Sequence, residues 1–260
     1  MNKPARIAFL IVLLVSNLIV SAQKKKKQDV SAYAFDKDWK SCELKDAEYL
    51  CIKEKISDTI FKWSSYFITG SLIYVESYKD EELTIPHGLF SWYDKRGRID
   101  TLGYTSNGKR DKTWYYFTDS STVWQTETYE KGKLISKQDS FDIRMERENL
   151  KGGVDTNRFI MVEVEATFPG GEKSWRKYLE ANIKYPERAS KLGKTGTVMV
   201  SFMVGKDGAL GDMYIAQSVE YSLDAEAMRL LQSSPNWIPA NQNGRPVKAY
   251  RKQPFHFALQ

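Results

Sequence analysis

The stretch from Gly196 to Val204, GTVMVSFMV, constrains the fold more than any other part of the sequence, because it alternates strictly between two sets of side chains. Alternation with a period of two predicts a β-strand with one buried face. The KDG that follows predicts a turn, and GDMYIAQS predicts the returning strand of an antiparallel hairpin. The expected buried face contains Val198, Val200, Phe202 and Val204.

Helical periodicity flanks this hairpin on both sides. Before it, Trp175, Tyr178 and Leu179 fall on one face of a predicted helix, which ends before Pro186 because proline disfavours helical geometry in the preceding residue. After it, Ser222 is the expected cap of a second helix. The apolar stripe of that second helix contains Leu223, Ala227, Leu230 and Leu231.

One more predicted strand, from Val247 to Leu259, closes the chain after an Asn-Gly reversal. The order helix, strand, strand, helix, strand predicts an α+β fold, with a small antiparallel sheet packed on two helices. We assign this domain to residues 159–260 and a polar, glycine-bearing linker to residues 139–158.

An internal repeat with an offset of about 24 residues lies upstream, where HGLFSWYDKRGRIDTLGYTSNGKR aligns with DKTWYYFTDSSTVWQTETYEKGKL. Alternating aromatic residues and Gly-Lys turns predict short antiparallel hairpins, and hence an all-β region over residues 70–138. These copies resemble MORN-type repeats, although Lys112 stands where that pattern has a glycine. The simpler interpretation is that the aromatic residues pack a single-layer sheet. Residues 23–69 mix helical and strand signals and stay unassigned.

The N-terminus carries Lys3 and Arg6, then an apolar run from Ile7 to Val20, and Ala22 suits a signal-peptidase site. We therefore expect residues 1–22 to be a Sec-type signal peptide and the mature protein to be periplasmic. An uncleaved inner-membrane anchor facing the periplasm is the alternative. An exported chain permits disulfides, so Cys42 and Cys51 could form a local bridge or remain two free thiols.

Several function classes lack support in the sequence. The net charge of +6 is modest and is not gathered into one basic stripe, so nucleic-acid binding is not expected. LGKTG lacks the first glycine of a phosphate-binding loop, because Arg188 stands at that position. His87 and His256 neighbour neither a nucleophile nor a second metal ligand in the sequence. We expect no enzyme, no cofactor and no metal site.

The C-terminal region resembles the C-terminal domain of TonB, the periplasmic energy transducer of Gram-negative bacteria. The resemblance rests on FPGG, YP, G-x-V-x-V-x-F-x-V, DG, LDAEA, P-x-W-x-P and NG-x-PV, which together are specific. As the scaffold of this domain, the resemblance implies Pro169, Gly170, Gly171, Tyr185, Pro186, Gly196, Asp207, Gly208, Asp224, Ala227, Pro235, Trp237, Pro239, Asn243 and Gly244.

The resemblance also implies a role for the last strand. In the family, a sheet edge accepts an extended peptide, the TonB box of an outer-membrane transporter, by β-augmentation. Phe255, Phe257 and Leu259 share one face and are expected to contribute to the core as well. The expected docking edge contains Val247, Ala249, Tyr250, Arg251, Gln253 and Phe255.

Two features depart from the family. A transducer is anchored by a helix whose histidine couples it to the ExbB and ExbD motor, and a proline-rich spacer then crosses the periplasm. The apolar N-terminal run here contains no histidine, and the 8 prolines are scattered. The sequence therefore favours a periplasmic module that docks an envelope or outer-membrane protein. The alternatives are an anchored energy transducer with an ExbB/ExbD-type motor, and a structural envelope protein whose terminal strand pairs with itself in a strand-exchanged homodimer.

Overall fold

A computed structural model describes residues 29–118, 122–143 and 164–259. The predicted signal peptide or anchor, residues 1–22, and most of the predicted linker lie outside these ranges. Within them, no helix is long and apolar enough to cross a membrane.

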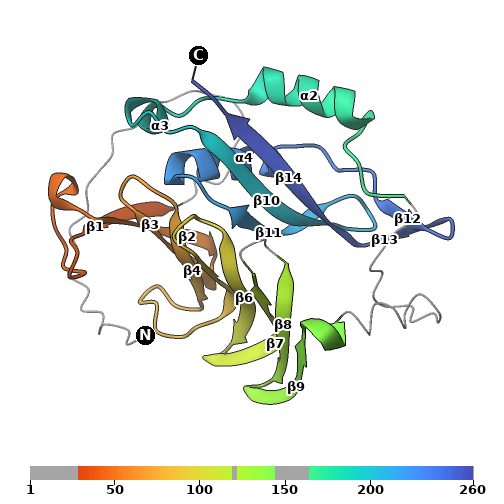
Figure 1. The fold of residues 1–260 in the computed structure, drawn as a ribbon, viewed down its shortest axis with the longest axis horizontal. Helices are drawn as coiled ribbons and strands as arrows, with labels where there is room; N and C mark the ends of the chain where they lie inside the picture. Colours follow the sequence, from red (N-terminus) through yellow and green to blue (C-terminus); the bar gives the residue numbers. More distant parts are fainter. Residues whose placement is uncertain (1–28, 119–121, 144–163, 260) are drawn as a thin grey trace.

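The N-terminal half forms one antiparallel sheet of nine strands in which neighbours in sequence are neighbours in space (Figure 1). Residues 30–69, which the sequence left unassigned, supply its first strands together with a short 3-10 helix, η1 (Leu44–Asp46). The strands are β1 (Val30–Phe35), β2 (Tyr49–Ser57), β3 (Ile60–Phe67), β4 (Leu72–Tyr78), β5 (Gly88–Tyr93), β6 (Ile99–Ser106), β7 (Lys109–Phe117), β8 (Val123–Glu130) and β9 (Lys133–Asp139).

The two sequence repeats correspond to the hairpins β5–β6 and β7–β8. Phe90, Trp92 and Trp114 pack together on one face of the sheet, whereas Tyr93, Tyr115 and Phe117 face the core shared with the C-terminal half. Trp92 and Trp114 stack with ring centroids 5.8 Å apart. Trp114 lies flat on β6 because Gly103 has no side chain there: a Cβ at this position would be 2.0 Å from the indole. The packing fits the interpretation of a single-layer aromatic sheet, and the relation to MORN repeats stays a prediction.

The C-terminal half contains the expected small antiparallel sheet, in the order β11-β10-β14, with helices on one face. The predicted face of β10 is fully buried, and it packs with the apolar stripe of α4, which is buried as well. The elements are α2 (Gly171–Asn182), α3 (Glu187–Lys191), β10 (Gly196–Val204), β11 (Leu210–Gln217), α4 (Tyr221–Gln232), β12 (Ala240–Gln242), β13 (Arg245–Val247) and β14 (Ala249–Phe257).

The structure corrects two local predictions in this half. Glu220, rather than Ser222, caps α4, and its carboxylate accepts a hydrogen bond from the Ser222 N–H at 2.8 Å. The predicted last strand is two strands, because the Asn-Gly turn closes a separate hairpin of β12 and β13. Val247 ends β13, where it is buried opposite Ala240, and is not part of the terminal strand.

Of the two alternatives for Cys42 and Cys51, the structure shows the one without a disulfide. Cys51 pairs with Tyr33 on one side of β1, whereas the Cys42 N–H donates to the Ala34 carbonyl on its other side. Strands separated by a third strand are roughly 9–10 Å apart, whereas a disulfide needs Cα atoms within about 7 Å. β1 therefore keeps the two thiols apart.

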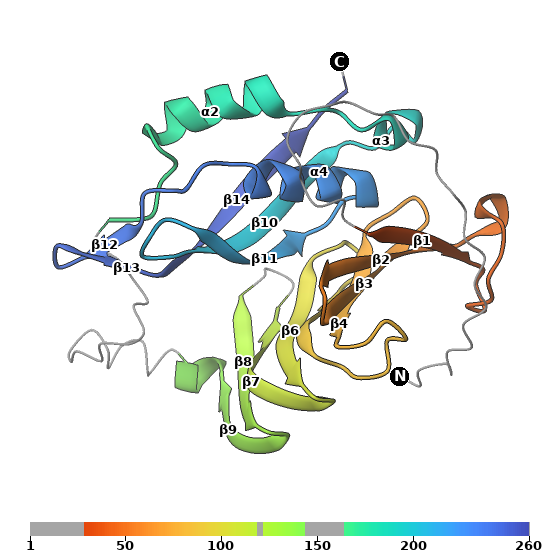
Figure 2. The same ribbon diagram turned by 180° about the vertical axis from the view of Figure 1, so that it is seen from behind.

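The two halves share one hydrophobic core, and both views place α2 and β6–β9 on opposite sides of the small sheet (Figures 1 and 2). The β5–β6 turn docks against β11: the Ser218 N–H donates to the Gly97 carbonyl at 2.8 Å. Tyr93 Oη donates to the Ile215 carbonyl at 2.7 Å, and Gln217 Nε2 donates to the Arg96 carbonyl at 2.9 Å. These contacts lie at the C-terminal end of β11.

Candidate functional site

Strand β14 is an edge strand of the small sheet. It pairs with β10 along its whole length, from Gly196↔Phe257 to Val204↔Ala249, and no strand of the described residues pairs with its other side. The opposite edge, β11, is met by the β5–β6 turn. Among the described residues, β14 therefore forms an edge without a neighbouring strand along its whole length, whereas the β5–β6 turn covers the C-terminal end of the β11 edge.

The side chains of β14 divide between the two faces of the sheet. Phe255 and Phe257 are buried in the core, where Phe255 meets Trp175 at a ring distance of 6.0 Å. Tyr250 lies on the other face and is 62% exposed. Its hydroxyl donates to Asp212 Oδ2 at 3.2 Å; desolvation and the nearby Asp212 carboxylate raise its pKa, which keeps the phenol protonated.

Three further predicted docking residues, Ala249, Arg251 and Gln253, lie on β14 at intermediate exposure. Arg251 forms an ion pair with Glu165, and Gln253 Nε2 donates to the Pro254 carbonyl at 3.1 Å. Ala249 starts the strand opposite Val204. Of the six predicted residues, four are thus partly or largely exposed on β14, Phe255 belongs to the core, and Val247 lies in β13.

Pro254 fits this position because an edge strand has one side without ladder hydrogen bonds. A proline removes no hydrogen bond between β14 and β10 when its nitrogen faces the open side. Since backbone groups alternate along a strand, we infer that the N–H groups of Tyr250, Lys252 and His256 face the open side too. β14 then offers donors and acceptors for another strand.

The predicted scaffold residues build the layer that supports β14. The Trp237 N–H donates to the Gly208 carbonyl at 2.9 Å, and its ring packs on Phe202 at 5.0 Å. Tyr185 donates to the Lys194 carbonyl. The other scaffold residues lie at element ends, in turns and between helix and sheet: Pro169, Gly170, Gly171, Pro186, Gly196, Asp207, Asp224, Ala227, Pro235, Pro239, Asn243 and Gly244.

Residues 181–259 match the family described as Gram-negative bacterial TonB protein C-terminal. Over these residues the chain is similar to a TonB C-terminal domain, and we call this part of the molecule the TonB-type domain. The match supports a TonB-like protein-interaction module of the Gram-negative envelope, and it covers α3, α4 and all three strands of the small sheet. None of the curated proteins or solved structures matches the chain at a significant level.

Asp224 joins the TonB-type domain to the large sheet. The sequence placed it in the first turn of a helix, but its carboxyl group is completely buried. Ser218 Oγ donates to it at 2.5 Å and accepts from the Leu72 N–H of β4 at 2.8 Å. Burial raises the pKa of Asp224 to about 7, although hydrogen bonds from Ser218 and Val219 oppose the shift.

A second polar connection lies beside it. Glu220 is almost fully buried, and Arg188 of α3 pairs with it at 2.6 Å while also donating to the Ile68 carbonyl. Sequence reasoning missed both connections, because Leu72 is 146 residues from Ser218 and Ile68 is 120 residues from Arg188, and no local pattern links them.

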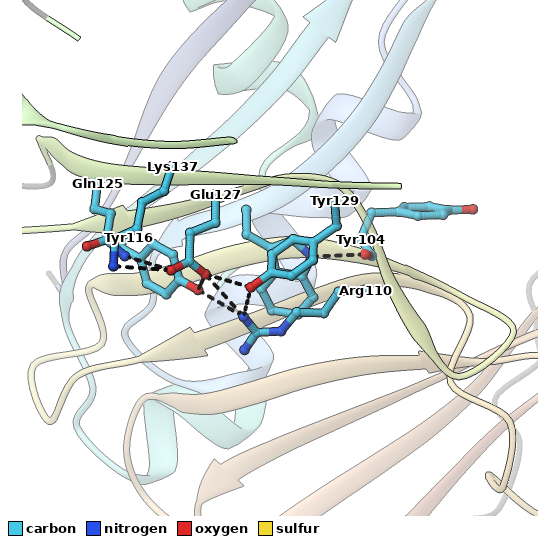
Figure 3. Close-up of polar contacts among 8 residues, drawn as sticks. Tyr104, Arg110, Tyr116, Gln125, Glu127, Tyr129 and Lys137 are labelled. Atoms are coloured by element: carbon cyan, nitrogen blue, oxygen red, sulfur yellow. Dashed lines mark hydrogen bonds and ion pairs between the residues drawn. The ribbon is translucent and has the colours of Figure 1, made fainter. Parts of the chain in front are cut away.

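The large sheet carries a polar cluster on β7–β9 that the sequence also did not reveal (Figure 3). Glu127 accepts hydrogen bonds from Tyr116 at 2.7 Å and Tyr129 at 2.8 Å, and Arg110 lies over the Trp114 ring at 4.3 Å. Burial raises the pKa of Glu127, but the two tyrosine hydroxyls and the nearby Lys137 and Arg110 outweigh it and lower the pKa overall. Its carboxylate oxygens already have partners, so the cluster stabilises the sheet.

Proposed function

We propose that this protein is a periplasmic docking protein that works by binding rather than by catalysis. An extended, TonB-box-like segment of an outer-membrane or envelope protein would add to β14 as a further strand. Backbone hydrogen bonds would supply affinity, and neighbouring side chains would select the partner. The observation that carries the proposal is the open edge of β14, in a sheet whose other edge is partly covered by the β5–β6 turn.

The geometry of β14 supports this mode of binding. The strand is held rigidly by nine paired positions on β10 and by two buried phenylalanines, so its backbone is already extended. A preformed edge costs little ordering entropy when a peptide binds. The proposal includes export of the chain and its release into the periplasm after cleavage of the signal peptide. Residues 1–28 lie outside the residues that the structure describes. N-terminal sequencing of the protein from its native host separates a released chain starting at Gln23 from an anchored transducer starting at Met1.

The edge can be tested with two substitutions at Tyr250. Tyr250→Pro removes the side chain and the N–H that we assign to the open side, while Tyr250→Ala removes only the side chain. We expect Tyr250→Pro to weaken binding at least about tenfold, because an unmade backbone hydrogen bond and a steric clash each cost on the order of 1 kcal/mol. We expect Tyr250→Ala to stay within about threefold.

The measurement uses the purified mature protein and detergent-solubilised outer-membrane proteins of its native host. Bound proteins are identified by mass spectrometry, and the affinity of the extended N-terminal segment of each receptor is then measured by calorimetry. Equal affinities for wild type and Tyr250→Pro, with folding intact, contradict the proposal. Capture of only a second copy of the chain supports strand-exchanged self-pairing instead.

A further inference from the structure

A cavity of about 670 Å³ lies between the TonB-type domain and the large sheet, on the face of the small sheet opposite the helices. Its floor is formed by Thr197 and Met199 of β10 and by Gln217 of β11. Lys95 and Arg96 of the β5–β6 turn line one wall, and Lys252 of β14 lines another. The cavity therefore exists only because the two halves of the chain pack together.

The cavity is basic. Three of its lining residues, Lys95, Arg96 and Lys252, are cationic, and none is acidic. Within the described ranges, no ion pair engages the charged groups of these three residues. Like charges held around one hollow repel one another and attract an anion, which gains favourable interaction with all of them.

The position of Lys252 on the edge strand β14 favours a carboxylate of a docked segment as the anion that the cavity attracts. The turn that carries Lys95 and Arg96 is bonded to the outer edge of β11, whereas Lys252 lies on β14, so β11 and β10 stand between them. Neighbouring strands are about 4.8 Å apart, which separates the two backbones by roughly 14 Å. A segment docked on β14 runs along that strand and presents side chains about 6.6 Å apart on each face, so its carboxylates lie beside Lys252.

We propose that this cavity selects partners by binding acidic side chains of the segment that docks on β14. The inference rests on the proposed function and adds the chemistry of the ligand. Side chains of a strand added to β14 alternate between the faces of the sheet, so one set lies beside Lys252 on the face of the cavity. A carboxylate of this set pairs with Lys252, and the positive charges of Lys95 and Arg96 across the cavity add to its electrostatic attraction.

The probes are two labelled eight-residue peptides that alternate Thr with Glu or Thr with Gln, and so differ only in charge. Fluorescence anisotropy with the mature protein measures their affinities at low and high salt. We expect the Glu peptide to bind at least about tenfold more tightly at low salt and to lose this advantage at high salt. Lys252→Gln, and Lys95→Gln combined with Arg96→Gln, should each weaken Glu-peptide binding several-fold and leave Gln-peptide binding unchanged.

Lys177→Gln is the matched control. Lys177 is exposed on α2, so this substitution removes one positive charge at a site outside the cavity. A thermal melt of each variant checks that the fold is intact. The inference is overturned if the two peptides bind equally or if neither binds. It is also overturned if Lys177→Gln weakens Glu-peptide binding as much as the cavity variants do. Displacement of the Glu peptide by a few millimolar inorganic phosphate, with direct phosphate binding that needs Lys252, also overturns it, because the cavity then takes a single anion.

Tyr250→Pro separates this inference from the proposed function. If it abolishes binding of both peptides while their affinities for wild type are equal, edge docking stands and the cavity has no role in selection. If it leaves a salt-sensitive preference for the Glu peptide intact, the cavity binds anions without the edge, and both the docking proposal and the inference that rests on it fail.

Discussion

Gly208 shows how one residue determines the layer beneath β14. Its backbone has φ +80°, and a Cβ would lie 2.0 Å from the Trp237 carbonyl oxygen. Gly244 has a similar φ of +74° but open space around it. We therefore expect Gly208→Ala to lower the free energy of unfolding by more than about 2 kcal/mol, and Gly244→Ala by only about 1 kcal/mol. Urea denaturation measures both, and equal losses would show that backbone strain alone matters at Gly208.

At the scale of elements, the last three strands of the large sheet depend on the charge of Glu127. Glu127→Gln would leave the Arg110 guanidinium without its carboxylate and weaken the hydrogen bonds from Tyr116 and Tyr129. We expect this substitution to lower the free energy of opening β8 and β9 by about 1–3 kcal/mol. Hydrogen exchange of the amides in these strands measures the loss.

Glu130→Gln is the control for that experiment, because Glu130 is exposed at the end of β8 and has the same charge. Faster exchange in β8 and β9 with Glu130→Gln as well would assign the effect to net charge. Unchanged exchange with Glu127→Gln would mean that aromatic packing alone stabilises these strands.

At the scale of the whole molecule, Asp224 makes the junction of the two halves sensitive to pH. Its pKa is raised from 3.8 in an unperturbed carboxyl group to about 7 in the folded protein, because burial disfavours the charged form. The folded state therefore holds a proton that the unfolded state has released. The protonated Asp224 carboxyl group stabilises the folded state fully below about pH 4. This stabilisation declines as the pH rises and is lost above about pH 7.

Asp224→Asn replaces the titratable carboxyl group with a neutral amide of nearly the same shape. We expect the stability of the variant relative to wild type to rise by about 1.4 kcal/mol per pH unit between pH 5 and 7, and to change little above pH 8. Urea denaturation across this range measures the difference, with the exposed Asp38→Asn as control. A difference independent of pH would show that Asp224 is charged throughout.

Local patterns predicted the elements of the TonB-type domain well. The alternation of Val198, Val200, Phe202 and Val204 identified the buried face of β10, because side chains of a strand alternate whatever surrounds it. The apolar stripe of α4 was also predicted correctly from its helical spacing. Two predictions were wrong where backbone geometry decides between residues close in sequence. Glu220 caps α4 in place of Ser222, and Val247 belongs to the separate β12–β13 hairpin that the Asn-Gly turn closes.

Other features could not be predicted, because they join distant parts of the chain. Cys42 and Cys51 are close in sequence, but the pairing of β1 with β2 separates them. Residues 30–69 show no clear period, because both faces of their strands carry mixtures of aromatic and polar side chains.

The sequence by itself determined the strand faces, the helices, the turn glycines and the resemblance to the TonB C-terminal family, since each depends on residues close together in the chain. The tertiary structure alone decided which edge of the small sheet is open, because the β5–β6 turn meets β11 across more than 100 residues. It also decided the burial of Asp224 and the basic cavity between the two halves. A side chain's burial and the charges around it depend on which surfaces pack together, and that information is spread over the whole sequence.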